Sequence, residues 1–209
     1  MQRPSIGGLA FGAAACALVA ASASAETIIQ EWSAITTPPP PELRAVAADP
    51  KTTAILVLDF LNQSCGRRPR CIASIPAVQK LLADGRAKGA SVIHSVVTNM
   101  TTSDIRGELT PAPGEPVVVS GPDKFLRTDL EKILREKQIQ TVIVMGTAAH
   151  GAVLYTASAA ALRGFNVVVP VDGMSSEPAY PEQYTAWHLA NAPVVSPKVT
   201  LTQMTMITF

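Results

Sequence analysis

Hydrophobic and polar positions follow two alternating patterns along the chain after Thr53. Continuous apolar runs such as "TTAILVLDF" and "QTVIVMG" are typical of strands that are buried on both faces. Four further runs predict strands: "ASVIHSVVT", "PVVV", "FNVVVPVD" and "KVTLTQM". Such runs are expected in a parallel sheet that is covered on both sides.

Helical patterns separate these runs. The segment "SIPAVQKLLADGRAKG" predicts a helix with Ser74 as its N-cap, Pro76 in its first turn and Gly89 at its end. Three more helices are predicted from "RTDLEKILREKQI", "AVLYTASAAALRG" and "PEQYTAWHLANA". The alternation predicts an α/β fold over residues 53–209, a three-layer sandwich whose mainly parallel sheet has helices on both faces.

The N-terminal segment has a different pattern. One cation, Arg3, precedes the apolar run "IGGLAFGAAACALVAA" and the small-residue stretch "SASA". This order predicts a signal peptide over residues 1–25, removed on export to the periplasm or out of the cell. A membrane anchor is the alternative, although the run is short for a span. Residues 26–52 are proline-rich and aperiodic, which predicts an arm over the surface or toward a neighbouring subunit of a homo-oligomer.

Charge gives no case for a polyanionic partner. Removing Arg3 with the signal reduces 17 Lys and Arg residues to 16, against 16 Asp and Glu residues. A neutral chain without a basic stripe argues against binding to nucleic acid or, in the mature form, to an anionic membrane. A small-molecule substrate or ligand, or a protein, is the expected partner.

Two cysteines remain after the predicted signal, Cys65 and Cys71 in "CGRRPRC". In an exported protein, two thiols separated by so short a loop most simply form a local disulfide. The alternative is a reactive thiol activated by the nearby cations Arg67, Arg68 and Arg70.

Candidate site residues follow from the fold class. In an open α/β sheet, ligands bind in the crevice beyond the carboxyl ends of the strands. The polar residues at or after predicted strand ends are Asp59, Thr98, Asn99, Thr147, His150 and Asp172. We expect these side chains to converge on one pocket.

Individual roles remain open at this point. Asp59 is either an acid in the pocket or a cap for the following turn. Asn62 and Gln63 either line the rim of the pocket or stabilise a turn. His150 either forms hydrogen bonds within the site or only satisfies a backbone carbonyl. Lys124 in "GPDKF" is a solvated partner of its neighbouring acid or a cation beside Asp59.

Histidine spacing gives no support for a metal. His94, in "VIHSVV", is more typical of a satisfied core residue, and His188 is packed or exposed on a helix. The three histidines lack the HxH or HExxH spacing of zinc ligands. Neither a metal nor another cofactor is expected.

The order of these features resembles the isochorismatase-like hydrolase superfamily, also called the cysteine hydrolase family. The resemblance extends from "AILVLDFLNQ" to "VTLTQMTMITF". Its specific parts are Asp59, the F-x-x-T-D-L-x-x-x-L segment at Phe125–Leu134, and "VIVMGTAAHGAVLYTASAAALRGFNVVVPVDGMSS". The family's catalytic set is Asp, Lys and Cys. By counting, the lysine falls near Val119 or Ser120, so Lys124 reaches the site only through a loop of different length.

The resemblance places Ala152 at the position of the nucleophilic cysteine. A methyl group cannot attack a carbonyl, so a covalent amidase route is closed there. The pair Ala149 and His150 resembles the isochorismatase branch, in which a vinyl ether is hydrolysed by protonation and water addition. The resemblance also implies a dimer or tetramer.

Three hypotheses follow from the sequence. In the first, Asp59 is a general acid or base with water, Lys124 and His150 orient the substrate, and five residues line its pocket. Those five are Asn62, Gln63, Asn99, Thr147 and Ala152. In the second, the chain is a catalytically inactive small-molecule-binding module. In the third, a reduced Cys65 is a displaced nucleophile near Asp59. A further alternative is that Ala152 was introduced by mutation in place of another residue.

Overall fold

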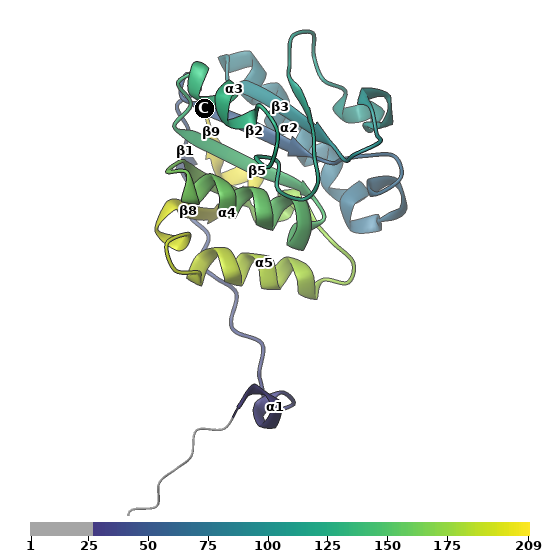
Figure 1. Cartoon of the computed structure of the whole chain (residues 1–209). Coiled ribbons are helices and arrows are strands. Elements are labelled where there is room, and N and C mark those ends of the chain that lie inside the picture. Colours follow the sequence, from purple (N-terminus) through teal and green to yellow (C-terminus); the bar gives the residue numbers. More distant parts are fainter. Residues whose placement is uncertain (1–26) are drawn as a thin grey trace, which may run out of the picture. The chain divides into compact units, whose positions relative to one another are not determined.

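The computed structural model describes residues 27–209; the predicted signal peptide and Cys16 lie outside the described residues. The chain divides into two compact units, Met1–Thr37 and Pro38–Phe209. The described part of the first contains the short helix α1 (Ile28–Glu31). The second contains the sheet and the larger helices (Figure 1).

A parallel sheet forms the centre of the second unit. Its strands lie in the order β4-β3-β2-β5-β6-β8, and β7 pairs with the end of β5. Every pairing in this sheet is parallel. The strands are β2 (Thr53–Leu58), β3 (Ser91–Val96), β4 (Val117–Val119), β5 (Thr141–Thr147), β6 (Asn166–Pro170), β7 (Met174–Ser175) and β8 (Val199–Thr202).

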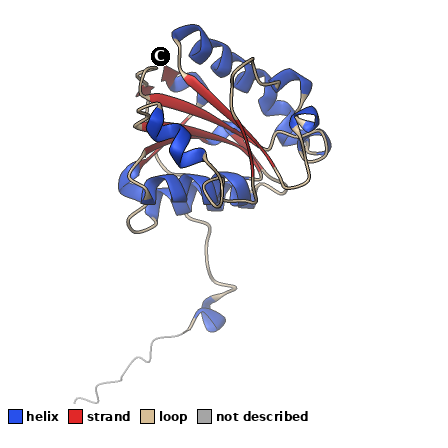
Figure 2. Ribbon diagram, turned by 45° about the horizontal axis from the view of Figure 1, so that its top comes forward, coloured by secondary structure: helices blue, strands red, loops and turns tan. Residues whose placement is uncertain are grey.

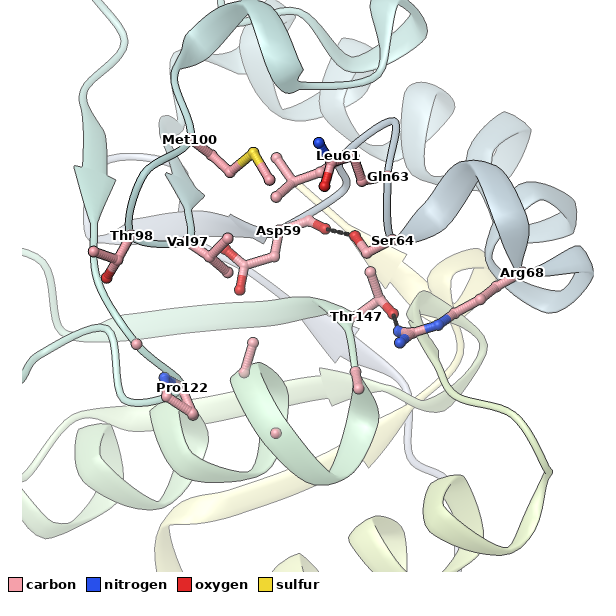
Figure 3. A pocket seen from close by; sticks show the side chains of 14 residues that line it. Asp59, Leu61, Gln63, Ser64, Arg68, Val97, Thr98, Met100, Pro122 and Thr147 are labelled. Carbon is pink, nitrogen blue, oxygen red and sulfur yellow. Dashed lines mark hydrogen bonds between the residues drawn. The ribbon is translucent and has the colours of Figure 1, made fainter.

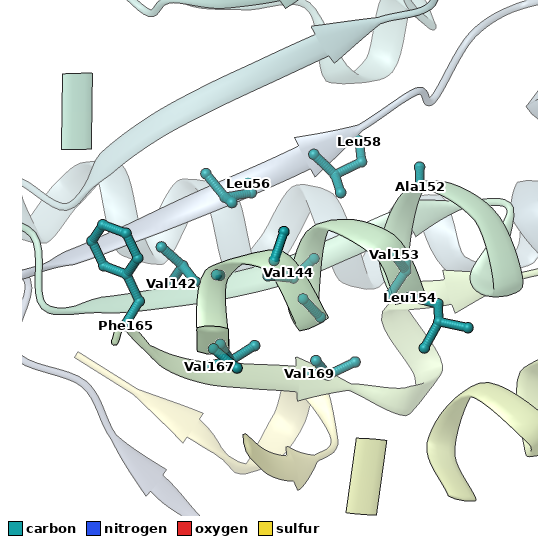
Figure 4. Packing of buried hydrophobic residues seen from close by; sticks show 14 of the residues in the cluster. Leu56, Leu58, Val142, Val144, Ala152, Val153, Leu154, Phe165, Val167 and Val169 are labelled. Carbon is teal, nitrogen blue, oxygen red and sulfur yellow. The ribbon is translucent and has the colours of Figure 1, made fainter. Parts of the chain in front are cut away.

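Helices cover both faces of this sheet (Figure 2). They are α2 (Pro69–Lys88), α3 (Leu130–Glu136), α4 (Leu154–Leu162) and α5 (Tyr180–Asn191). Alternate residues of β2 belong to two separate hydrophobic clusters. Leu56 and Leu58 pack in the cluster of α3, α4 and α5 (Figure 4), while Ile55 and Val57 pack in that of α2. The predicted three-layer α/β fold is confirmed.

Helix α2 begins earlier than the sequence pattern predicted. It starts at Pro69, so the prediction of Ser74 as N-cap is wrong; the Ser74 hydroxyl is buried and donates to the Cys71 carbonyl oxygen at 2.8 Å. Pro69 suits the first helical position because it has no N–H to leave unpaired and its φ is preset. Pro76 is therefore inside the helix. The predicted end is confirmed, with Gly89 at φ 84°.

The predicted arm is partly ordered on the second unit. β1 (Val46–Ala47) and β9 (Ile207–Thr208) form a small parallel sheet that the sequence pattern did not predict. Arg44 N–H also donates to the Leu201 carbonyl oxygen at 2.9 Å. Residues 38–52 therefore belong to the compact unit. No helix within residues 27–209 is long and apolar enough to cross a membrane.

Candidate active site

Asp59 directly follows β2 at the centre of the sheet. Its φ of 53° turns the chain away from the strand, a conformation that Asp adopts more readily than most residues. The side chain is 7% exposed. Its Oδ1 accepts a hydrogen bond from Ser95 Oγ at 2.7 Å, and its Oδ2 lies 2.7 Å from Lys124 Nζ. Both carboxylate oxygens are therefore held in fixed directions.

Lys124 is the cation of this pair and has no solvent-exposed surface. Its Nζ also donates to the Ser120 carbonyl oxygen at 3.4 Å, and its backbone N–H donates to Thr156 Oγ1 on α4 at 3.2 Å. The alternative of a solvated surface lysine is wrong. The loop between β4 and α3 brings this amine to Asp59 although it lies several residues after the position expected from the motif.

A pocket of about 620 Å³ opens beside Asp59 at the carboxyl ends of β2, β3 and β5 (Figure 3). Its polar lining residues are Asp59, Gln63, Ser64, Arg68, Thr98 and Thr147. Its main apolar lining residues are Leu61, Val97, Met100, Pro122 and Ala152. A pocket with apolar walls and few polar groups is typical of small-molecule sites.

The turn after β5 forms one wall of this pocket. β5 passes very close to the end of β2 at Gly146, where an added Cβ would lie 2.3 Å from the Leu58 carbonyl oxygen. Glycine is therefore needed for these two strand ends to meet. The π-helical turn η4 (Ala149–Val153) follows and places the methyl group of Ala152 at the pocket. The sequence pattern placed the start of this helix later.

The predicted residues divide into those that line the pocket and those that do not. Asp59, Gln63, Thr98, Thr147 and Ala152 line it, and Lys124 is buried behind Asp59. Asn62, Asn99 and His150 are exposed and do not belong to its lining. Sequence places these three at the correct end of the sheet, whereas the direction of each side chain depends on the local turn.

His150 instead belongs to a neighbouring hydrogen-bonded group. Its Nδ1 lies 3.1 Å from Ser176 Oγ, and the same hydroxyl accepts a hydrogen bond from the Ala149 N–H at 3.0 Å. Ser176 is 1% exposed, so this serine does not meet solvent-borne substrates. The group ties the turn after β5 to the segment after β7.

Asp172 lies in a different place from that expected. Its Oδ1 accepts the Met204 N–H at 2.9 Å, and it lines a hollow with Arg70 and Glu182 instead of the pocket of Asp59. The expected convergence is wrong for this residue. After β6 the chain continues into the 3₁₀ turn η5 (Val171–Gly173), which packs against α2.

Two important residues of the site were not predicted as such. Ser95 is the penultimate residue of β3 and lies opposite Leu58, which precedes Asp59. A hydroxyl inside an apolar run was the available signal for it. Arg68 was considered only as an activator of a thiol, but it lines the pocket, and its NH1 donates to Thr147 Oγ1 at 2.7 Å.

The predicted disulfide between Cys65 and Cys71 is confirmed, with a Cα–Cα distance of 5.2 Å. Both residues have no exposed surface. The disulfide leaves no free thiol in this loop. It therefore argues against an activated thiol here and against Cys65 as a displaced nucleophile. The loop between the two cysteines carries Arg68 toward the pocket.

His94 is a core residue on β3, as its sequence context indicated. Its Nε2 lies 3.0 Å from Glu115 Oε2, and Glu115 also accepts two hydrogen bonds from Arg86 at 2.7 and 2.8 Å. Burial lowers the pKa of His94, and the bond to Glu115 offsets this only in part. Burial acts to raise the pKa of Glu115, but hydrogen bonds from Arg86, Ala112 N–H and His94 together lower it.

No group of three or more His, Cys, Asp and Glu side chains among residues 27–209 is arranged to hold a metal ion. The chemical groups that the site offers are thus the buried Asp59–Lys124 pair, hydroxyls and one arginine.

Fold and site together define a class: a parallel α/β domain with a buried carboxylate–lysine pair beside a strand-end pocket. The isochorismatase domain model matches residues 53–199, and the chain therefore belongs to the isochorismatase family. Solved structures that share this fold include an amidase and a nicotinamidase, each 20% identical to this chain.

One curated relative is the Secreted isochorismatase effector Isc1 of Verticillium dahliae, which is 33% identical over 113 residues. That match covers 49% of this chain and 60% of the relative, so the chain spans about three fifths of that protein's length.

Solved structures share the fold. An isochorismatase-like hydrolase from Alkaliphilus metalliredigens is 26% identical with a TM-score of 0.66, covering 74% of this chain and 95% of that one. N-carbamoylsarcosine amidase from Thermoplasma acidophilum is 20% identical with a TM-score of 0.63, covering 73% of this chain and 96% of that one. At this identity, the likeness to the amidase concerns the fold alone.

Proposed function

We propose that this chain is an exported isochorismatase-family hydrolase that adds water to a small molecule with the help of Asp59 and without a nucleophilic cysteine. The observation that carries the proposal is the set of side chains that line the pocket. Asp59, paired with Lys124, faces the same pocket as Ala152, which takes the place of the family's cysteine by its motif position. Because a methyl group cannot act as a nucleophile, water is the nucleophile in the proposed reaction.

Three other potential nucleophiles near Asp59 are already engaged in other contacts. Ser64 Oγ donates to the Asp59 carbonyl oxygen at 3.1 Å, and Thr147 Oγ1 accepts from Arg68. Cys65 is in the disulfide. These contacts support a reaction in which no enzyme atom forms a bond to the substrate.

Asp59 then acts as the proton-transfer group. The water oxygen bonds to the electrophilic carbon while one water proton moves to the Asp59 carboxylate. That proton passes to the leaving nitrogen of an amide or carbamoyl substrate as its bond to the carbon breaks, so atoms and charge balance. For a vinyl ether, a protonated Asp59 first gives its proton to the terminal alkene carbon; water then bonds to the ether carbon and returns a proton to Asp59, and the hemiketal releases the alcohol. Lys124 and Ser95 fix the carboxylate in the direction needed for both transfers.

In this proposal, His150 is a positioning residue. Through Ser176 it supports the turn that carries Ala149 and Ala152. Asn62 and Asn99 are assigned to the outer rim, where a larger substrate would meet them.

Export is supported by three observations. The first 25 residues have the pattern of a signal peptide, the loop at 65–71 is closed by a disulfide, and a curated relative is named as secreted. The proposal places the protein in the periplasm or outside the cell. It also includes a homo-oligomer, which remains to be measured by light scattering.

Substitution of Asp59 tests the reaction. The mature protein is assayed against amides, carbamoyl compounds and vinyl ethers, with Asp59→Asn, Asp59→Glu and the control Asp84→Asn, whose carboxylate pairs with Lys80 on the exposed face of α2. We expect Asp59→Asn to lower turnover about 100-fold or more, as for loss of a general acid or base. Asp59→Glu keeps the charge beside Lys124 but displaces the carboxylate, and the control keeps full activity.

Unchanged turnover in a folded Asp59→Asn variant contradicts the proposal. The second candidate is a binding module, which Ala152 favours because it provides no reactive atom. For that candidate, no substrate class is turned over, yet ligands raise the melting temperature.

A further inference from the structure

The pocket contains a second charged residue that the proposed reaction does not use. Arg68 and Asp59 are the charged side chains of its lining. Asp59 is already neutralised by Lys124, which lies behind it with no exposed surface. The charge of Arg68 therefore determines the net charge that a ligand meets in the pocket.

The partner of Arg68 is a neutral group. Its NH1 donates to the Thr147 hydroxyl at 2.7 Å. Among residues 27–209, no carboxylate lies within ion-pair distance of its guanidinium. A guanidinium has several N–H groups in a planar fork, so most of its donors remain free for a ligand.

The backbone holds Arg68 in place. The residue is the N-cap of α2, and its N–H donates to the Cys65 carbonyl oxygen at 2.9 Å. The disulfide between Cys65 and Cys71 closes the loop around it. Figure 3 shows its side chain extending to Thr147, on the wall of the pocket next to Asp59. Such fixed placement reduces the entropy lost on binding.

We infer that Arg68, oriented by Thr147, binds the carboxylate of a small organic monoanion in this pocket. The inference rests on the proposed function and narrows its substrate class. Arg binds carboxylates through two parallel N–H···O bonds, a geometry suited to its free donors. The ligand's hydrolysable group then lies toward Asp59.

A monoanion fits this pocket better than a dianion. One uncompensated cation balances one negative charge, whereas a phosphate dianion would leave an excess charge near the Asp59 carboxylate. The walls formed by Leu61, Val97 and Met100 favour an apolar body for the ligand. The inferred class is thus a carboxylic acid with an apolar body and a hydrolysable bond.

Binding measurements test this inference without turnover. The probes are benzoate and cyclohexanecarboxylate, their neutral primary amides, and inorganic phosphate. Affinities are measured by NMR titration for the wild type, Arg68→Gln, Arg68→Lys and Arg67→Gln. Arg67 is the matched control, because it is the adjacent arginine of the same loop, exposed and outside the pocket lining.

We expect both carboxylates to bind more tightly than their amides and more tightly than phosphate. Arg68→Gln should weaken carboxylate binding by about 10- to 100-fold and leave amide binding unchanged, as for loss of a hydrogen bond between charged groups. Arg68→Lys should keep part of the preference, and Arg67→Gln all of it.

Equal binding of acids and amides, including no binding of either, overturns the inference, as does a preference that survives in Arg68→Gln. Tighter binding of phosphate than of carboxylates also overturns it. These outcomes are independent of Asp59-dependent turnover, so the inference and the proposed function can fail separately.

Discussion

At the scale of single residues, the buried pair of Asp59 and Lys124 has the largest expected effect on stability. Lys124→Met leaves the carboxylate buried without its cation, which costs about 3–5 kcal/mol of unfolding free energy in comparable buried pairs. Lys80→Met removes the cation of an exposed pair on α2 and should change stability by less than about 1 kcal/mol. Urea unfolding of both variants measures the two costs.

A double variant separates charge from packing. Asp59→Asn combined with Lys124→Met should recover part of the loss, because no buried charge then lacks a partner. Equal costs for Lys124→Met and Lys80→Met would contradict the pairing described here.

Sequence reasoning at this scale found the positions better than the directions of side chains. Asp59 could be predicted because an acid at the end of an apolar strand has few structural roles. Lys124 could not be placed by counting, since the path of the loop between β4 and α3 determines where its amine lies. His150 and Asn99 were expected in the pocket, but the π-helical turn and a positive φ at Asn99 direct them elsewhere.

At the scale of elements, the loop between Cys65 and Cys71 links stability to ligand recognition. Replacing both cysteines by serine should lower the free energy of unfolding by about 2 kcal/mol, the chain-entropy value for so short a loop. It should also weaken the preference for carboxylate over amide probes, because Arg68 lies within the loop. Thermal unfolding and the NMR titration measure the two effects.

Dithiothreitol gives the matching control. It should reproduce both effects in the wild type and have none in the double-serine variant. A serine variant that keeps the full carboxylate preference would show that the disulfide does not position Arg68.

Most elements could be predicted from sequence, and the two-residue strands could not. β2 and β5 are continuous apolar runs because both of their faces are buried, so their pattern is unambiguous. β1 and β9 have two residues each, too few to show any period. The start of α2 was missed because Ser74 resembles an N-cap, while Pro69, five residues earlier, is the residue that begins the helix.

At the scale of the whole molecule, strand order explains why the site forms where it does. β2 lies between β3 and β5, so the residues that follow these three strands meet around Asp59. β6 lies one strand further along, and Asp172 after it faces α2 instead. The alternation of elements in the sequence predicts a parallel sheet but not this order, which depends on contacts between distant segments.

Acid should destabilise the molecule as a whole, in two steps. His94, Glu115 and Arg86 connect β3, the loop before β4 and α2. Burial lowers the pKa of His94 below its ordinary 6.5, so the stability that its neutral ring contributes is complete above that pH and is lost as pH falls. The pKa of Glu115 is also below its ordinary 4.5, so its contribution disappears at still lower pH.

Urea unfolding between pH 8 and pH 4 at constant ionic strength measures this dependence. The wild type should lose stability from about pH 6.5 downward, because the unfolded chain takes up a proton at His94 that the folded chain resists. His94→Asn should be less stable at pH 8 but nearly flat down to about pH 5, while His188→Asn, a half-buried histidine on α5, should keep the slope of the wild type. Parallel curves for the wild type and His94→Asn would show that another group causes the loss, because the proton uptake assigned to His94 would then occur without it.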